Sequence, residues 1–411
     1  MDQYGISKLD LKRLNRKQIL RILKENGPTS RIDIAAQLDL TRAAVTIITT
    51  DMIEQGIIYE VGEYKAKNQK ATRGRKKILL DINYHYKFVV GIVLEEKVVS
   101  VGLTTLYGEV LDKHNLFIKA GMIPDDVADF LVKAVKQVIS DNCLDENSIL
   151  GVGMGVHPEL YSRANIEIVD GVPNFENLKK TWSEKLQLPV VVNSSVIGTL
   201  CANIDFYHQS DKQLSNVTLF QYGREIDFIY SIDGEPVKSI MNRTNCISKM
   251  VLDPFAKEVC PVCGKKGCVH NEVASLSILT RIHKAYSAEK TPYLYEITKG
   301  DINAIIGELI VSAYMHGDKA ITQIFNRVLD LMSLLVHNIS LLTNSEKVIL
   351  HFYYFESTMA YELLKQRLLE VCGKEVAKKL IPSCVDYKHR FLSGCALAIR
   401  ELFYEKGGFD N

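Results

Sequence analysis

The sequence predicts an α/β protein in which a small helical module precedes an α/β body of two lobes. Residues 30–56 show two short helical patterns, whereas from residue 86 onward short apolar runs alternate with amphipathic segments. The 411 residues exceed one ordinary core and indicate two or three domains. Residues 1–80 carry 16 Lys and Arg against 9 Asp and Glu, while the remainder carries 34 against 40. A basic module therefore precedes an acidic body, as phosphate binding requires.

Composition indicates a soluble globular chain, with 47% hydrophobic and 24% charged residues. No run of about 18 apolar residues appears, and the N-terminus MDQYGISKLD lacks the apolar core of a signal peptide. We therefore expect a cytoplasmic protein without a membrane partner. Nine cysteines in a cytosolic chain are expected to be free thiols, apart from one cluster described below.

The first helical pattern in SRIDIAAQLDLTRAAVTIITTDMIEQG begins at Ser30, which can cap a helix with Asp33 three residues later. Its expected buried face consists of Ile32, Ala35, Ala36 and Leu38. The pattern breaks at Asp39-Leu40. Two short helices around a tight polar break predict a helix-turn-helix.

The second helix is expected to start after Thr41 and to end at Gly56. Its apolar stripe is Val45, Ile48, Met52 and Ile53, and its opposite face is Arg42, Ala43, Thr46, Ile47 and Thr50. Small residues let a recognition helix approach base edges, and Thr and Arg offer donors. We predict DNA contacts at Ser30, Arg31, Thr41, Arg42, Ala43, Thr46 and Ile47. An ordinary helical hairpin is the alternative.

A helix before this motif would complete a three-helix core. Its apolar face is Leu11, Leu14, Ile19, Ile22 and Leu23. Its basic face is Lys12, Arg13, Arg16, Lys17, Arg21 and Lys24. Those cations are expected either to follow the DNA backbone or simply to be solvated.

After Gly56, IIYEV and KILLDI read as paired strands around the basic loop GEYKAKNQKATRGRKK. A basic hairpin that follows a recognition helix predicts a wing. Arg73, Arg75 and Lys76 are therefore predicted to bind DNA, with the RGR element in a narrow minor groove. A disordered interdomain linker would have a similar composition.

The body begins with three predicted strands in hairpin succession, KFVVGIVLEEKVVSVGLTTLYGEVLDKHNL, with Gly108 at a turn. The helix DDVADFLVKAVKQVISDN and the strands ILGVGMGV and LPVVVNSS follow. A second lobe is expected from Ser215, with strands VTLFQYG, FIYSIDG and KVILHFYYF and a closing helix FLSGCALAIRELFY. The expected domains are 1–82, 83–214 and 215–411.

With the module and body identified, the chain resembles the ROK family, which contains sugar kinases and the repressors derived from them. The resemblance covers nearly the whole chain and rests on the helix-turn-helix, on TRGRKKILLDI, on ILGVGMGV and LPVVVN, and on MVLDPFAKEVCPVCGKKGC. The last stretch is the most specific. The resemblance implies a two-lobed actin/hexokinase-like, ribonuclease H-like body behind a winged helix-turn-helix.

Several departures from the family's kinases predict that catalysis is lost. The hairpin that should be glycine-rich for ATP phosphates reads GIVLEEK, with Glu95 and Glu96. The catalytic Asp of the family is Ser194 here, and a serine of normal pKa cannot accept the sugar proton. The second phosphate turn reads YGRE from Tyr222, and the late Gly-Gly is replaced by HFY from His351. We expect no catalytic residue and no ATP.

The family's sugar contacts correspond here to Asn193, Ser194, Cys246, Lys249 and His270, of which only Asn193 is kept. Effector contacts are assigned to Asn193, Ser194, Lys249 and His270 in the cleft between the lobes. The alternative is a degenerate pocket that remains only as a scaffold.

Cys260, Cys263 and Cys268 have C-x₂-C-x₄-C spacing, with Gly264 and Gly267 between them. Thiolates at this spacing favour tetrahedral zinc in a structural role. The family's fourth ligand is a His, and Lys249 stands in its place. Cys246, His270 or water is expected to complete the site. Three reduced thiols on a loop are the alternative.

These features predict a sequence-specific, DNA-binding transcriptional regulator, a repressor of carbohydrate-related genes. The family resemblance implies a homodimer or tetramer on a pseudo-palindromic operator, with a sugar or sugar-phosphate effector that shifts the DNA-binding modules. One alternative is an active ATP-dependent ROK sugar kinase with an appended DNA-binding domain. Another is a ligand-independent DNA-binding protein whose body only dimerises.

Overall fold

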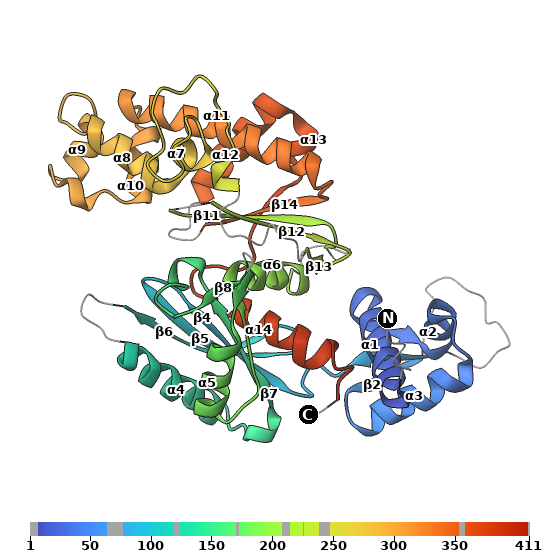
Figure 1. The fold of residues 1–411 in the computed structure, drawn as a ribbon. Coiled ribbons are helices and arrows are strands. Elements are labelled where there is room, and N and C mark those ends of the chain that lie inside the picture. The colour runs from blue at the N-terminus through green and yellow to red at the C-terminus, as the bar shows by residue number, and fades with distance from the viewer. Residues whose placement is uncertain are drawn as a thin grey trace. The chain divides into compact units, whose positions relative to one another are not determined.

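The computed structural model describes residues 7–63, 77–118, 124–169, 172–207, 214–224, 226–237, 247–352 and 358–409. By internal packing the chain forms two compact units (Figure 1). The first unit contains residues 1–156, 175–193 and 391–411, and the second contains 157–174 and 194–390. This division differs from the boundaries 82/83 and 214/215, because the C-terminal residues pack with the N-terminal part of the chain. None of the described helices is long and apolar enough to cross a membrane.

The N-terminal module has three helices and a three-stranded sheet in the order β1-β3-β2. Its helices are α1 (Lys8–Asn26), α2 (Arg31–Leu38) and α3 (Arg42–Glu54), and its strands are β1 (Thr29–Ser30), β2 (Ile58–Glu63) and β3 (Ile78–Ile82). Ser7, Ser30 and Thr41 cap the three helices. Asp39 takes a left-handed φ of 51° at the expected break. The predicted helix-turn-helix and strand pair are confirmed.

The core of this module differs from the sequence prediction at several positions. Ile19, Ile22 and Leu23 are buried as expected, but Leu11, Leu14 and Ile32 are exposed. The predictions for these three residues, and for the exposed Ala36, were wrong. In α1 only the later turns pack on the other helices, and α2 buries Ile34 and Ala35. Ile32 lies about 200° around the helix from Ile34 and therefore points outward.

The body of the first unit is a five-stranded sheet in the order β10-β7-β4-β5-β6. Its strands are β4 (Phe88–Leu94), β5 (Val98–Thr105), β6 (Val110–Phe117), β7 (Ile149–Val156) and β10 (Val190–Ser194). β4 pairs antiparallel with β5 and parallel with β7. The flanking helices are α4 (Pro124–Asp141), α5 (Glu176–Leu186) and α14 (Leu392–Ala398), which continues as η6 (Ile399–Tyr404). The predicted strands and helices of this lobe are confirmed.

Glycines in the strands let α14 approach the sheet closely. Gly102, Gly91 and Gly153 lie side by side across β5, β4 and β7. A Cβ at Gly153 would overlap the backbone of Gly394, and a Cβ at Gly91 would overlap that of Phe391. Gly91 of β4 and Gly153 of the run ILGVGMGV therefore allow backbone contact with the C-terminal segment at α14.

The second unit repeats this strand plan in the order β13-β12-β11-β14-β15. Its strands are β11 (Val217–Tyr222), β12 (Ile226–Ile232), β13 (Glu235–Pro236), β14 (Lys347–Phe352) and β15 (Leu380–Pro382). β11 pairs antiparallel with β12 and parallel with β14. In each sheet an antiparallel run of three strands is extended by two later strands. A separate hairpin joins β8 (Glu167–Val169) and β9 (Val172–Asn174).

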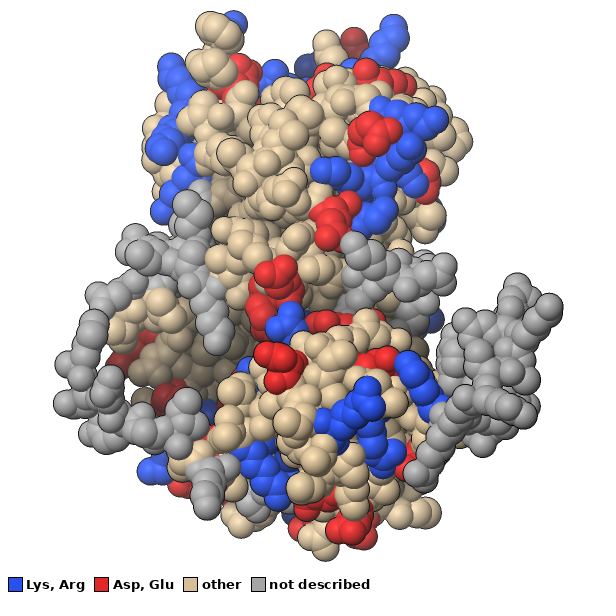
Figure 2. All heavy atoms as spheres, turned by 90° about the vertical axis from the view of Figure 1, so that its right-hand side faces the viewer, with Lys and Arg blue, Asp and Glu red and all other residues tan. Residues whose placement is uncertain are grey.

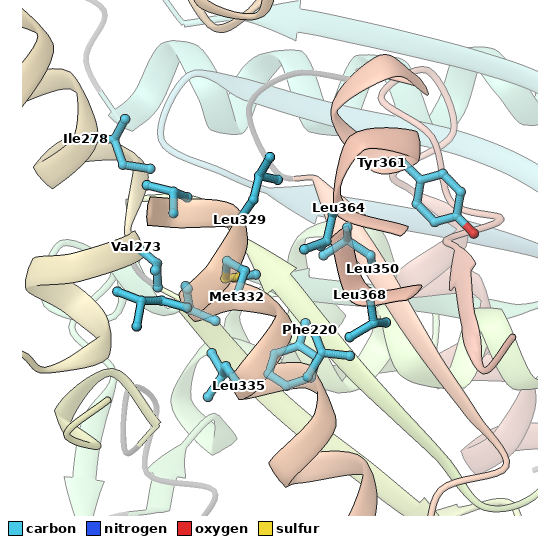
Figure 3. Packing of buried hydrophobic residues seen from close by; sticks show 14 of the residues in the cluster. Phe220, Val273, Ile278, Leu329, Met332, Leu335, Leu350, Tyr361, Leu364 and Leu368 are labelled. Carbon is cyan, nitrogen blue, oxygen red and sulfur yellow. The ribbon is translucent and has the colours of Figure 1, made fainter. Parts of the chain in front are cut away.

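Helices of the second unit cover its sheet and form its core. They include α6 (Ser195–Asp205), α7 (Val269–Val273), α8 (Ser275–Ala285), α9 (Pro292–Ile297), α10 (Gly307–Met315), α11 (Lys319–Leu342), α12 (Thr358–Cys372) and α13 (Lys374–Ala377). Figure 3 shows Leu329, Met332 and Leu335 of α11 packed towards Phe220 of β11 and Leu368 of α12. This apolar core gives α7 and the loop before it a rigid support.

Candidate nucleic-acid interface and the body behind it

Helix α3 presents one face to solvent and one to the core. Thr41 Oγ1 accepts the Ala44 N–H at 3.2 Å and begins the helix. Val45, Thr49 and Met52 are buried. The face predicted to read DNA is exposed, namely Arg42, Ala43, Thr46, Ile47 and Thr50. The Ile47 side chain is 72% exposed, so an apolar group stands at the surface where a thymine methyl would meet it.

Ser30 and Arg31 make contacts inside the module. Ser30 is buried; its Oγ accepts the Asp33 N–H at 3.3 Å as the cap of α2 and donates to Asp33 Oδ2 at 2.6 Å. Arg31 donates from Nε to Thr49 Oγ1 at 3.0 Å and pairs with Glu60 at 3.0 Å. Their predicted DNA contacts remain predictions. The Arg31 side chain joins α2 to α3 and β2.

The strands of the wing are present, and the tip of the wing lies outside the described residues. β2 and β3 pair antiparallel, with Ile58 opposite Ile82. Residues 64–76 are not described, so the predictions for Arg73, Arg75 and Lys76 are not tested. At the base of the wing, Lys77 Nζ lies 2.8 Å from Asp33 Oδ1. The hydrogen bonds from Lys77 and Ser30 lower the pKa of Asp33.

Charge on the described surface is mixed. Figure 2 shows one face of the molecule, on which Lys and Arg atoms alternate with Asp and Glu atoms. Within the winged helix and its C-terminal neighbour, Lys12 pairs with Asp51 at 2.9 Å, and Lys17 pairs with Glu405 at 2.6 Å. Several cations of α1 are therefore neutralised within the protein.

Residues 404–409, which we call the C-terminal clasp, hold the winged helix through Arg16. The Arg16 side chain is 0% exposed. Its Nε donates to the Gly407 carbonyl at 2.8 Å, and its guanidinium carbon lies 3.8 Å from the centre of the Phe409 ring. Nη2 donates to Gln55 Oε1 at 2.9 Å, at the end of α3. One buried cation thus joins α1, the recognition helix and the C-terminal clasp.

The clasp corrects the prediction that Arg16 belongs to the solvated basic face of α1. Gly407 and Gly408 have φ values of 65° and 71°, and a Cβ on Gly407 would press on the Arg13 carbonyl and the Arg16 side chain. Lys24 Nζ lies 4.6 Å from the centre of the Tyr404 ring. Sequence reasoning missed this site. The glycine pair before Phe409 was a signal of tight chain approach, but it did not identify the partner.

In the body, the turn between β4 and β5 carries the carboxylates that replaced the expected phosphate loop. Glu95 is 5% exposed, and its N–H donates to the Val98 carbonyl at 3.0 Å as part of a closed hairpin.

A polar cluster fills part of the second unit. His157 Nε2 lies 2.8 Å from the side-chain amide of Gln221 and 3.9 Å from Asp227 Oδ2. Burial, with a smaller contribution from His351, lowers the pKa of His157 to about 3. Burial lowers the pKa of His351 to about 4. Both imidazoles are therefore neutral at pH 7.

The predicted effector contacts lie in different settings. Ser194 is buried and caps α6, with its Oγ accepting the Val196 N–H at 3.3 Å. Asn193 is half-buried at the end of β10. Lys249 is exposed, and its carbonyl accepts from Lys265 Nζ at 3.5 Å. His270 is buried beside the cysteine cluster, so it lies with the sulfur atoms.

The structure brings the three predicted thiols together. The sulfur atoms of Cys260, Cys263 and Cys268 lie within 4.8 Å of one another. Gly264 and Gly267 adopt φ values of 71° and 62° in the loop between them. A Cβ on Gly267 would overlap the Asp253 carbonyl, so only glycine fits this turn. Three convergent thiolates are a donor set that fits zinc. Cys246 lies outside the described residues.

Comparison with known proteins agrees with this arrangement. A family described as winged helix-turn-helix DNA-binding matches residues 12–59. The xylose repressor of Caldicellulosiruptor bescii is 23% identical over 370 residues, which cover 89% of this chain and 88% of the relative. A solved ROK family transcriptional regulator, a homologue of the Escherichia coli MLC protein, superposes with a TM-score of 0.68 at 19% identity. The superposition covers 96% of this chain and 97% of that regulator's chain.

The body also has the fold of sugar kinases. A ROK family glucokinase from Streptomyces griseus superposes with a TM-score of 0.55 at 14% identity, covering 75% of this chain and 98% of the kinase. The chain is therefore similar over nearly its whole length to a xylose repressor and to a solved ROK family transcriptional regulator, and its winged helix-turn-helix precedes a body with the fold of sugar kinases.

Proposed function

We propose that this protein is a sequence-specific repressor of genes for the use of a sugar. The observation that carries the proposal is the exposed face of α3, which presents Arg42, Thr46 and Ile47 from a winged helix-turn-helix. The xylose repressor of Caldicellulosiruptor bescii matches this chain over 88% of the repressor's own length. Its name supports a sugar-responsive role for this chain.

The proposed contacts divide into base readout and backbone binding. Arg42, Ala43, Thr46 and Ile47 would enter the major groove, where Arg pairs with guanine and Ile contacts thymine methyls. Thr41 would anchor the start of the helix on a phosphate. Arg73, Arg75 and Lys76 would follow the minor groove and backbone. Ser30 and Arg31 would add contacts at the edge of this surface only after giving up part of their internal bonds.

We propose that the body binds an effector and does not transfer phosphate. Glu95 is buried at the turn where a kinase would hold phosphates, and Ser194 caps α6 where a catalytic carboxylate would stand. The shared kinase fold favours the active sugar kinase as the second candidate. ATP turnover separates the two functions.

A sugar or sugar phosphate is the proposed effector, with Asn193, Ser194, Lys249 and His270 as the predicted contacts. We also propose a homodimer or tetramer on a pseudo-palindromic operator, because a two-fold protein matches two half-sites. A protein that acts on an operator works beside the chromosome, so cytoplasm is the proposed location. A zinc ion in the cysteine cluster would have a structural role, as is typical of sites with several cysteine ligands.

The test begins with selection of bound duplexes from a random DNA pool by the full-length protein. The selected duplex is then titrated with protein in the presence of a panel of sugars and sugar phosphates. We expect a two-fold-symmetric sequence that outcompetes random DNA by at least about 10³-fold, with one sugar class lowering the affinity. Equal binding to selected and random duplexes would overturn the repressor proposal. Specific binding that no sugar changes would support the ligand-independent alternative.

A further inference from the structure

We propose that His270 is the fourth ligand of the metal held by Cys260, Cys263 and Cys268. The ligand set is then C-x₂-C-x₄-C-x-H, with all four donors inside eleven consecutive residues, 260–270. In the described part of the second unit, the His270 imidazole is the nitrogen donor that reaches this cluster. Its Nδ1 lies 3.5 Å from Cys260 Sγ.

The distances match a tetrahedral site. With zinc–sulfur bonds of about 2.3 Å and zinc–nitrogen bonds of about 2.0–2.1 Å, two ligand atoms at a tetrahedral angle are separated by about 3.6 Å for S and N and by about 3.8 Å for two sulfurs. Cys260 Sγ and His270 Nδ1 lie 3.5 Å apart, as do Cys263 Sγ and Cys268 Sγ. The ring nitrogens of His270 are not within 4.8 Å of all three sulfurs, so metal binding would require the His270 ring to move towards Cys263 and Cys268.

Local structure directs His270 to the cluster. Cys268 caps α7, and the Asn271 N–H donates to its sulfur at 3.4 Å. His270 follows two residues later in the first turn of α7 and is 7% exposed. A buried imidazole beside a sulfur needs a polar partner, and the metal supplies one. Lys249 is exposed and carries a cation, which cannot ligate.

Ion pairs behind α7 keep the histidine in place. Glu272, on the same helix, is 4% exposed and accepts from Arg327 Nε at 3.1 Å and Nη2 at 2.9 Å. Arg327 also pairs with Asp253 at the entrance to the cysteine loop. One arginine therefore ties α7 to the loop that holds the sulfurs. We expect this framework to hold His270 near the metal position before the metal arrives.

A consequence concerns the effector. A histidine that binds metal cannot also hydrogen-bond a sugar through the same nitrogen, so His270 leaves the set of proposed effector contacts. The metal then takes all its ligands from the cysteine loop and α7. Its retention should therefore not depend on Lys249, which stays available as an effector contact.

The experiment counts the ligand atoms in the whole protein. X-ray absorption at the zinc edge, together with the absorption spectrum of the cobalt-substituted protein, is measured for wild type, His270→Ala, His270→Cys and Cys246→Ser. His283→Ala, in the last turn of α8, is the matched control. We expect three sulfurs and one imidazole nitrogen in wild type, Cys246→Ser and His283→Ala, and four sulfurs in His270→Cys.

Retention of the metal against a chelator gives a second readout. We expect His270→Ala to lose zinc at least about tenfold faster than His283→Ala, because a ligand is replaced by water. Four sulfurs in wild type, with one lost in Cys246→Ser, would assign the site to Cys246 and overturn the proposal. An unchanged spectrum in His270→Ala, or absence of metal from freshly purified wild type, would also overturn it. If His270→Ala does not fold, the change from three to four sulfurs in His270→Cys decides the question.

Discussion

Replacing Arg16 by Met should release the C-terminal clasp from the winged helix. Methionine keeps an unbranched apolar side chain in the same space but removes every donor. The substitution leaves the buried Gly407 carbonyl without the bond it accepts at 2.8 Å and removes the donor to Gln55 at 2.9 Å. It also removes the cation above the Phe409 ring. The first unit should therefore open locally at its C-terminal end.

The magnitude follows from burial. A hydrogen bond from a charged donor contributes about 1.5–3 kcal/mol, and a desolvated cation–π contact contributes about 2 kcal/mol. Asp51 adds little, because it is partly exposed and keeps Lys12 as a partner at 2.9 Å. The contacts share one side chain and are not additive. We expect a loss of about 3–5 kcal/mol, which increases the opening equilibrium of the clasp by roughly 10²–10³-fold or more.

Native-state hydrogen exchange, read on peptides from residues 400–409 and 51–57, measures that opening directly. Arg13→Met is the matched control, since exposed Arg13 donates to the Glu405 carbonyl at 3.0 Å from the same helix. It should change protection by less than about tenfold. The reasoning is refuted if Arg16→Met leaves protection of both peptides equal to that of the Arg13→Met control.

Three further predictions concern DNA, catalysis and pH. Arg42→Ala should cost about 1–3 kcal/mol of binding free energy on the selected operator and relax the sequence preference. Lys76→Ala should weaken binding to all duplexes alike and reduce the slope of log affinity against log salt concentration by about one. Competition assays at several salt concentrations distinguish these outcomes. Neither wild type nor Ser194→Asp should phosphorylate hexoses or amino sugars with ATP. A positioned carboxylate is commonly worth about 10²–10⁴-fold, but the turn GIVLEEK lacks the glycine pair expected to hold the ATP phosphates. Product above a heat-killed control would promote the kinase alternative. Because burial depresses the pKa of His157 from 6.5 to about 3, the unfolded chain takes up a proton first, so stability present above pH 6.5 is lost as pH falls towards 3; urea unfolding at pH 7 and pH 5 should show a smaller loss for His157→Gln than for wild type.

Much of the fold could be predicted from the sequence because its determinants are local. Thr41 caps a helix through an N–H three residues away, and short continuous runs of apolar residues mark β4, β7 and β11 as buried strands. The exposed face of α3 could also be predicted from the sequence. So could the grouping of the three cysteines, because all three lie within one short loop. The predicted DNA-reading face and the candidate metal-binding loop therefore follow from residues that are close together in the chain.

The tertiary structure decided which polar residues are buried and which partners they meet. In the sequence Arg16 is one of several cations on a basic helix. In the structure it is fully buried and donates a hydrogen bond to a carbonyl 391 positions away. The glycines of β4 and β7 face a helix from the other end of the chain. His270 was one of several possible ligands until its distance to Cys260 was known. Periodicity and capping involve residues a few positions apart, whereas these contacts depend on how distant segments pack, and packing leaves no pattern in the local sequence.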